Sequence, residues 1–255
     1  MSTLSRGMMG ALVAALCLPV PQAQALLLDR GAGMLYDTVL NVTWLQDANH
    51  AATSGYCDTL GNCHPTIGPA GRMNWTQANT WANGLEYGGH SDWRLARKSP
   101  VNGTASGWNY GYSVNGTTDV GYNITSTFSE LSYMYYVNLG LKGYYSASGA
   151  YQPDHGVNGN GTFGGQRDVG LVKNLQSDVY WFGTAYAPSP ADFAWGLHTN
   201  GGQDGIGQSN VFYAWAVHEG DIAAVPVPGS VALLAGGLAL LGVVTRRRER
   251  LAVEK

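Results

Sequence analysis

The sequence is poor in charged residues, which make up only 12% of its 255 residues, about half the usual share. Its 14 Lys and Arg are outnumbered by 17 Asp and Glu, so the formal net charge is −3. A protein that binds nucleic acid needs a basic surface to neutralise phosphates, and this balance provides none. The composition therefore argues against a nucleic-acid partner.

The sequence also lacks the recurrent motifs of enzyme active sites. It has no H-E-x-x-H zinc motif, no G-x-S-x-G nucleophile elbow, no phosphate-binding loop and no dinucleotide fingerprint. The histidines are scattered without the spacing of paired metal ligands: His50, His64, His90, His155, His198 and His218. We expect no catalytic residues, metal or cofactor. Calcium, or a metal site assembled across the fold, stays an open alternative that no motif supports.

Cysteine is scarce as well, with three residues in the chain. Cys17 lies in an N-terminal apolar run, whereas Cys57 and Cys63 share one short stretch. In an oxidising compartment such a pair is most simply a disulfide. A metal site that includes His64 is the alternative, but three ligands in one short loop make a poor tetrahedral set. We therefore predict a Cys57–Cys63 disulfide.

The N-terminus has the pattern of a secretory signal peptide. Arg6 precedes an apolar run from Met8 to Leu18, and Ala23-Gln24-Ala25 supplies the small residues of a cleavage site. The run is too short for a membrane anchor. We expect residues 1–25 to engage the Sec translocon and to be removed by signal peptidase, which leaves the rest of the chain exported.

The C-terminal residues 225–255 combine a proline motif, an apolar stretch and a basic tail. Their markers are Pro226, Pro228, the uncharged residues 229–244, Arg246, Arg247 and Arg248. About 18 helical residues rise roughly 27 Å, just enough to cross a membrane with the arginines on the cytoplasmic side. The three parts resemble the PEP-CTERM sorting signal, although its Pro-Glu-Pro core is Pro-Val-Pro here. The resemblance implies a transient inner-membrane stage, processing by an exosortase-type enzyme, and delivery to the envelope or extracellular matrix of a Gram-negative bacterium. An ordinary tail anchor is the alternative.

The middle of the chain predicts a helix followed by a strand. The helix, Asn74–Leu85, has an apolar face at helical spacing formed by Ala78, Trp81, Ala82 and Leu85. Asn74 and Gln77 have capping-box spacing at its start. Asp92–Leu95 then alternates polar and apolar residues, as a half-buried strand does. We expect Trp81 to be buried in the core.

This helix–strand unit resembles the DUF1566 (Lcl C-terminal domain) family, whose hallmark is a W-x-x-A helix, a Gly-Gly turn and D-W-R-L-P. Further matching stretches include Asp29-Arg30-Gly31, Val42-Thr43-Trp44-Leu45, Tyr180-Trp181-Phe182-Gly183-Thr184 and Tyr213-Ala214-Trp215. The Pro-Thr expected after Leu95 is Ala96-Arg97, and the family's Glu-Leu corresponds to Glu130-Leu131. The resemblance implies one α+β domain over residues 26–224, with short antiparallel strands, two helices and long loops. Such a domain is distantly similar to C-type lectins and formylglycine-generating enzymes. The family's characterised member binds sulfated polysaccharide, but this chain lacks a comparable basic cluster.

The remaining elements follow from local patterns. Strands are predicted over Leu26–Asp37, Val42–Leu45, Val179–Ala187, Phe193–His198 and Val211–Glu219. A capping box of Thr127 and Glu130 predicts a helix that ends at Leu139, before Gly140. Residues 98–123 and 143–165 are rich in Gly, Asn, Ser and Tyr without a period, and predict long surface loops. Arg94 is expected to bridge strand and helix through a carboxylate such as Asp47 or Glu130, and a clamp for an anionic ligand is the alternative. Four more tryptophans are expected in the core: Trp44, Trp75, Trp93 and Trp215.

The candidate ligand site lies in the loops between the late strands, Ala187–Phe193 and Thr199–Asn210. Aromatic faces beside amides and carboxylates suit the apolar C–H faces and hydroxyl rims of sugars. The predicted binding residues are Tyr186, Asp192, Trp195, Asn200, Gln203, Asp204, Gln208 and Asn210. Ordinary turn-forming side chains are the alternative interpretation of the same residues.

These patterns lead to one hypothesis and two rivals. We expect an exported protein of the envelope or matrix whose domain binds carbohydrate or matrix material, rather than an enzyme. One rival is an extracellular enzyme that acts on polysaccharide or peptide. The other is a structural matrix component with no discrete ligand.

Overall fold

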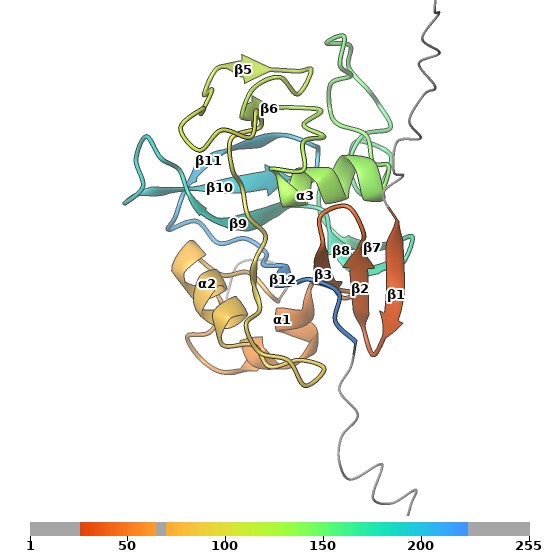
Figure 1. The fold of residues 1–255 in the computed structure, drawn as a ribbon, viewed down its shortest axis with the longest axis vertical. Coiled ribbons are helices and arrows are strands. Elements are labelled where there is room, and N and C mark those ends of the chain that lie inside the picture. The colour runs from red at the N-terminus through yellow and green to blue at the C-terminus, as the bar shows by residue number, and fades with distance from the viewer. Residues whose placement is uncertain (1–25, 65–69, 224–255) are drawn as a thin grey trace, which may run out of the picture.

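The computed structural model describes residues 26–64 and 70–223. In these residues the chain forms two five-stranded sheets and a two-stranded hairpin, with short helices packed around them (Figure 1). The fold is therefore α+β with strands predominant, as predicted. The signal peptide and the sorting signal, with Pro226, Pro228, Arg246, Arg247 and Arg248, lie outside the described residues.

The first sheet is antiparallel throughout and takes its strands from both ends of the domain. Its order is β1 (Leu27–Gly31), β2 (Met34–Asp37), β3 (Val42–Leu45), β12 (Ala216–Glu219) and β4 (Arg94–Leu95). The late strand β12 thus lies between two strands from the first hundred residues. The predicted strand Val42–Leu45 is confirmed, whereas β12 covers only the second half of Val211–Glu219.

The single strand predicted over Leu26–Asp37 is wrong, because the chain turns back on itself in the middle. Gly31, Ala32 and Gly33 all have positive φ, at 75°, 48° and 77°. Glycine adopts this backbone region without the steric cost that other residues meet, so two glycines permit the tight reversal. Asp29 Oδ1 also accepts a hydrogen bond of 2.7 Å from the backbone N–H of Gly31. The result is the β1–β2 hairpin.

The second sheet contains most of the late strands. Its order is β5 (Tyr112–Ser113), β6 (Val120–Gly121), β11 (Gln203–Gly207), β10 (Phe193–His198) and β9 (Val179–Ala185). The prediction for Phe193–His198 is confirmed. Residues 98–123 and 199–210 were expected only as loops, yet they contribute β5, β6 and β11. A separate hairpin, β7 (Gln166–Val169) with β8 (Val172–Gln176), was not predicted.

Helix α2 (Trp75–Asn83) forms where the sequence predicts it, starting one residue later and ending two residues earlier. Asn74 Oδ1 accepts from the backbone N–H of Gln77 at 2.9 Å, and Gln77 Oε1 accepts from that of Asn74 at 3.0 Å. This reciprocal pair satisfies two of the donors that a helix start leaves free. Trp81 is only 3% exposed, which confirms that its face of the helix is in the core. Two short helical segments, α1 (His50–Thr53) and η1 (Tyr56–Asp58), precede α2.

The second helix, α3 (Glu130–Tyr133), begins without the predicted capping box. Its N-cap is Ser129 rather than Thr127, and the Glu130 carboxylate bonds outside the helix, to the guanidinium of Arg94. The prediction that Arg94 pairs with a carboxylate is confirmed, with Glu130 as the partner. The helix continues as one wider π-helical turn, η2 (Met134–Asn138), and ends before Gly140, which has a φ of 61°.

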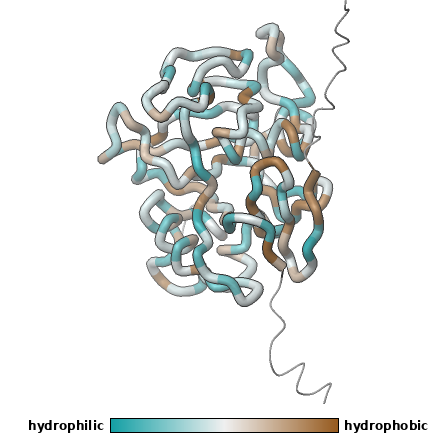
Figure 2. Tube along the Cα trace, viewed as in Figure 1, coloured by the Kyte–Doolittle hydropathy of each residue, from teal (hydrophilic) through white to brown (hydrophobic). Residues whose placement is uncertain are grey.

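The core between the two sheets is aromatic. Trp44, Trp93 and Trp215 are at most 2% exposed, as predicted, whereas Trp75 is only half-buried. Most of the largest remaining buried side chains come from β9, β10 and the segment before β12: Tyr180, Trp181, Phe182, Trp195 and Tyr213. Figure 2 shows the more hydrophobic stretches along the strands of the first sheet, and mainly hydrophilic or neutral residues in the upper loops.

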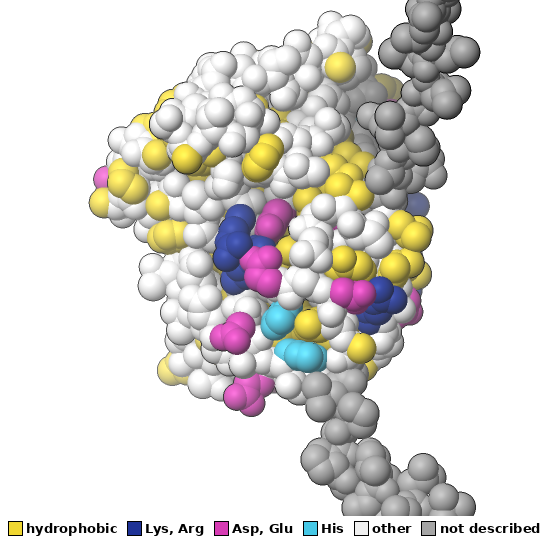
Figure 3. All heavy atoms as spheres, in the orientation of Figure 1, with side chains coloured by type: hydrophobic (Ala, Val, Ile, Leu, Met, Phe, Trp, Pro, Cys, Tyr) yellow, Lys and Arg dark blue, Asp and Glu magenta, His cyan; other side chains and the backbone are white. Residues whose placement is uncertain are grey.

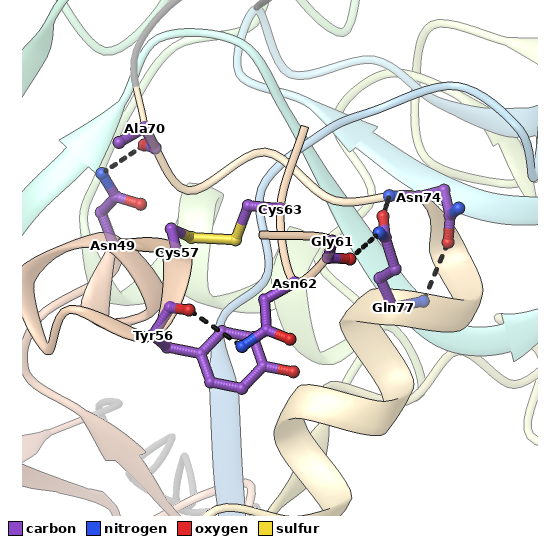
Figure 4. The surroundings of a disulfide bond; sticks show 9 residues. All are labelled: Asn49, Tyr56, Cys57, Gly61, Asn62, Cys63, Ala70, Asn74 and Gln77. Carbon is purple, nitrogen blue, oxygen red and sulfur yellow. Dashed lines mark hydrogen bonds between the residues drawn. A yellow bond between two sulfur atoms is a disulfide. The ribbon is translucent and has the colours of Figure 1, made fainter. Parts of the chain in front are cut away.

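Cys57 and Cys63 form the predicted disulfide, with Cα atoms 5.0 Å apart. Figure 4 shows the closed loop beside the start of α2. Gln77 Nε2 donates to the carbonyl of Gly61 at 2.7 Å, and Asn62 Nδ2 donates to that of Tyr56 at 3.0 Å. The disulfide loop is therefore tied both to itself and to the helix.

Candidate functional site

The predicted binding residues separate into several locations. Gln203 is buried, with 1% of its surface exposed. Its Oε1 accepts hydrogen bonds from the hydroxyls of Ser129 and Ser132, and its Nε2 donates to the carbonyl of Asp119 at 2.7 Å. All of these bonds join β11 to α3 and β6. Gln203 therefore holds the frame together and has no side-chain surface for a ligand.

Two of the predicted residues line a shallow cleft beside the start of α2. Asp192 and Gln208 border this cleft of about 470 Å³, together with Asn74 and Phe193. Gln208 Nε2 donates to the carbonyl of Phe193 at 3.1 Å, and Asp192 Oδ2 accepts from Ser189 at 3.2 Å. Their polar groups mainly close the loop before β10.

Three more of the predicted residues bond to nearby backbone, two of them in turns and Asp204 within strand β11. Asn210 Nδ2 donates to the carbonyl of Gly207 at 2.9 Å, and Asp204 Oδ1 accepts from the backbone N–H of Gly205 at 2.7 Å. Asn200 Oδ1 accepts from the backbone N–H of Gly202 at 3.0 Å, at the turn between β10 and β11. These bonds match the alternative interpretation of the sequence, in which the side chains serve their own loops.

Tyr186 and Trp195 are brought together, with ring centroids 4.8 Å apart. Two residues from the 98–123 segment join them. Trp108 stacks on Trp195 at 5.4 Å with an interplanar angle of 15°, and on Tyr110 at 6.0 Å with an angle of 11°. We call Trp108, Tyr110, Tyr186 and Trp195 the tryptophan cluster. Trp195 is its fully buried base, whereas Tyr110 is 36% exposed and Trp108 and Tyr186 are half-buried.

A buried ion pair fixes the loop that carries this cluster. Lys98 Nζ donates to Asp119 Oδ1, and both side chains are completely buried. Asp119 Oδ1 also accepts from the backbone N–H of Val101 at 2.9 Å, and Oδ2 from that of Asn109 at 2.8 Å. One carboxylate thus holds both arms of the loop that presents Trp108. A buried charge pair is tolerated when such additional hydrogen bonds satisfy it.

The Lys98 ammonium also contacts the aromatic rings. Nζ lies 4.9 Å from the ring centroid of Trp108 and 5.1 Å from that of Trp195, within the range of cation–π attraction. Burial lowers the pKa of Lys98, and the hydrogen bond and charge of Asp119 oppose that shift. The Lys98 ammonium therefore stabilises the tryptophan cluster from within the protein.

An open cleft of about 670 Å³ borders the tryptophan cluster. Its walls are the loop 99–105, the Gly183–Ala185 end of β9, and the rings of Trp108 and Phe128. Phe128 is 45% exposed, and a Cβ added at Gly103 would lie 2.7 Å from its ring. Thr184 and Arg97 supply polar groups to the rim. The cleft therefore combines apolar rings with hydroxyl and guanidinium donors.

The predicted site missed Lys98, Trp108, Tyr110 and Asp119, because their segment was expected to be only a surface loop. A signal was present in the sequence: Trp108, Tyr110 and Tyr112 alternate with Asn109 and Gly111. Alternation of this kind places residues two apart on one side of an extended chain. The ion pair has no comparable sequence signal, because its partners are 21 residues apart.

Most basic side chains of the described residues are paired with acidic ones. Of the eight Lys and Arg in the described residues, seven form ion pairs, and Arg167 donates to the carbonyl of Val157. Figure 3 shows this on one face, where basic and acidic side chains lie against one another in a largely uncharged surface. The same residues contain fifteen Asp and Glu, so their formal net charge is −7. This part of the chain therefore repels a polyanion.

The described residues contain neither a metal-binding group nor a membrane-spanning helix. Within residues 26–64 and 70–223, no group of three His, Cys, Asp or Glu side chains is placed to hold a metal ion. No helix of that part of the chain is long and apolar enough to cross a membrane. The predicted apolar segment 229–244 falls outside it.

Comparison of the chain with protein-family models, with curated proteins and with solved structures finds no match.

Proposed function

We propose that this chain is an exported, non-enzymatic module that binds an uncharged polysaccharide through the tryptophan cluster and the cleft beside it. One observation carries the proposal: the partly exposed rings of Trp108, Tyr110 and Tyr186 pack against one another, and Trp108 also lines an open cleft. Sugar rings have apolar C–H faces that pack on aromatic rings, and hydroxyl rims that take hydrogen bonds. A fixed surface also loses little conformational entropy when a ligand binds.

The charge balance supports an uncharged ligand. Recognition of sulfate or carboxylate groups relies on arginine and lysine donors that are free to reach them. Here Arg97 at the cleft rim bonds to Glu219 at 2.5 Å, and the Lys98 ammonium is buried against Asp119. The net charge of −7 in the described residues adds long-range repulsion of anionic polymers.

The location of the protein forms part of the same proposal. The N-terminal pattern of residues 1–25 supports export through the Sec translocon, and residues 225–255 support an inner-membrane intermediate followed by exosortase-type processing. The Cys57–Cys63 disulfide is compatible with a secreted protein. We also propose that the α+β domain is C-type-lectin-like, as the resemblance to the DUF1566 family implies.

Binding is tested with matched polymers that differ in charge. The mature protein from a Gram-negative host would be run in native gels that contain dextran, hydroxyethylcellulose or galactomannan. Parallel gels would contain dextran sulfate, carboxymethylcellulose or glycol chitosan, and each would be run with and without calcium. We expect retardation by at least one uncharged polymer, unchanged up to about 0.5 M salt, since screening acts only on charge–charge attraction. Release of reducing ends from the same polymers would be measured in parallel.

Variants locate the binding surface. Tyr110→Ala and Tyr186→Ala each remove a ring from the cluster and should weaken retardation about tenfold, the factor for one well-placed aromatic contact. Phe163→Ala removes an exposed ring outside the cluster and should leave retardation unchanged. No retardation by any polymer, retardation by the charged polymers alone, or steady release of reducing ends would each contradict the proposal.

A further inference from the structure

A second aromatic surface begins two residues after Tyr110 of the tryptophan cluster. It consists of Tyr112, Tyr122, Tyr144, Tyr145 and Tyr151, which we call the tyrosine cluster. Ring centroids lie 6.3 Å apart for Tyr112 and Tyr122, 5.4 Å for Tyr122 and Tyr145, and 4.9 Å for Tyr144 and Tyr151. Tyr144 and Tyr145, at 4.7 Å, link these pairs into one continuous group.

Three separate segments hold the tyrosine cluster in place. Asn123 Nδ2 donates to the carbonyl of Val114 at 2.6 Å and to that of Tyr145 at 2.8 Å, which joins two of the segments. The backbone N–H of Tyr144 donates to the carbonyl of Asn200 at 2.7 Å, which adds the turn between β10 and β11. The rings therefore sit on a fixed surface.

The outer rings of this cluster are open to solvent. Tyr112 is 60% exposed and Tyr151 is 54% exposed, more than any ring of the tryptophan cluster. Large aromatic side chains that are exposed next to one another often mark an interaction surface, whereas single exposed side chains scattered over a protein do not.

The polar groups near these rings are uncharged or already paired. Asn200 Nδ2 donates to the hydroxyl of Tyr122 at 3.4 Å, and the hydroxyls of Ser146 and Ser148 bond to each other. Lys142 pairs with Asp154. His155, which contacts the rings of Tyr144 and Tyr151, is buried, and its Nδ1 bonds to the carbonyl of Gln152 at 2.6 Å. Phenol, amide and hydroxyl groups of this kind match the hydrogen-bonding groups of a neutral sugar, and they offer nothing to balance a charged ligand.

The two clusters lie towards opposite ends of β10. The tryptophan cluster is built on Trp195 near the start of that strand, and the tyrosine cluster meets Asn200 just beyond its end. The chain from Trp195 to Asn200 spans at most roughly 17 Å. The clusters adjoin at Tyr110 and Tyr112, which are two residues apart. Sugar units at the far ends of the two clusters are therefore different units of one polymer or belong to different polymer chains.

We propose that the tyrosine cluster is a second binding site for the same uncharged polysaccharide, which makes the module bivalent. This inference rests on the proposed function, because it takes its ligand class from there. A polymer held at two sites binds more tightly than at either site alone, since the second contact forms at a high effective concentration.

The test removes each site separately. The double variant Tyr112→Ala/Tyr151→Ala empties the exposed part of the tyrosine cluster, and Tyr110→Ala weakens the tryptophan cluster. Affinity would be measured by gel retardation with whichever of dextran, hydroxyethylcellulose or galactomannan retards the wild-type protein. We expect the double variant to lose at least about tenfold in affinity and to keep residual binding, as expected when avidity is lost. Tyr112→Phe/Tyr151→Phe keeps both rings and should remain close to wild type.

The outcomes separate the two proposals. If Tyr112→Ala/Tyr151→Ala binds as tightly as wild type while Tyr110→Ala is weakened, the second site is wrong and the proposed function stands. If the double variant alters the oligomeric state of the ligand-free protein in sedimentation, the cluster is a protein interface and the inference is also overturned. If the wild-type protein binds no polymer, both proposals fail.

Discussion

The guanidinium of Arg94 and the carboxylate of Glu130 face each other through two hydrogen bonds, of 2.7 and 2.9 Å, across 36 residues of sequence. This pair joins β4 of the first sheet to the first residue of α3. Glu130 Oε2 also accepts from the backbone N–H of Arg97 at 2.6 Å. One carboxylate therefore connects the first sheet, the loop after it and the helix beside the second sheet.

Loss of that carboxylate should destabilise the whole domain. Both side chains are little exposed, at 13% for Arg94 and 12% for Glu130, and Glu219 offers Arg94 a second partner. We expect Glu130→Gln to lower the free energy of unfolding by about 2–3 kcal/mol, below the roughly 3–5 kcal/mol for fully buried pairs, because both side chains keep some solvent contact. Urea unfolding followed by tryptophan fluorescence measures it. Glu86→Gln, an exposed control, should stay within about 0.5 kcal/mol of wild type.

Removal of the buried ammonium should have a larger effect. Lys98→Met keeps the length of the side chain but leaves the Asp119 carboxylate buried without its cation. We expect a loss of about 3–5 kcal/mol, together with changed near-ultraviolet circular dichroism from Trp108 and Trp195. Adding Asp119→Asn removes the unpaired charge and should recover part of the loss. A double variant no more stable than Lys98→Met would show that the ion pair is not the source of the effect.

The disulfide should contribute modestly, because its loop is short. The chain-entropy estimate for a loop of this length is about 2 kcal/mol. Cys57→Ala/Cys63→Ala should therefore lower the midpoint of urea unfolding while leaving the fold intact. Mass spectrometry of the exported protein after alkylation should find no free thiol. Two alkylated cysteines would contradict the disulfide in the native protein.

High pH should weaken the fold through its buried tyrosines. Burial raises the pKa of Tyr135, Tyr136 and Tyr180 above 10.0, because desolvation disfavours the phenolate. The unfolded chain then loses protons near pH 10 that the folded chain keeps, so stability is intact below that pH and falls as the pH rises through it. Unfolding midpoints from about pH 8 to pH 11 would show the decline. The phenolate absorbance should rise in two stages, first from exposed rings such as Tyr112 and then with unfolding.

The sequence predicts the helix α2 well, because capping and apolar spacing are local signals. Asn74, Gln77 and Trp81 all lie where those patterns require. It predicts the tryptophan cluster poorly, because the position of Trp108 depends on an ion pair between Lys98 and Asp119 and on a strand formed 80 residues later. Contacts of this range leave no periodic pattern in the chain.

The same limit explains the mixed outcome for the candidate ligand residues. Tyr186 and Trp195 were selected for their chemistry and do meet in space. Gln203 was selected for its amide group, but its side chain faces α3, where its Oε1 accepts hydrogen bonds from the hydroxyls of Ser129 and Ser132. A polar side chain in a predicted loop gives no indication of which way it faces once that loop becomes a strand.

The central place of β12 in the first sheet determines when the domain can fold. β3 and β4 are made early, but the strand that joins them ends at Glu219, near the end of the domain. The pairing of Val217 with Trp44 closes a loop of more than 170 residues, and such distant contacts form slowly. The first sheet is therefore incomplete until nearly the whole domain is available, so a chain exported as we propose would leave this sheet unformed while it is threaded through the membrane.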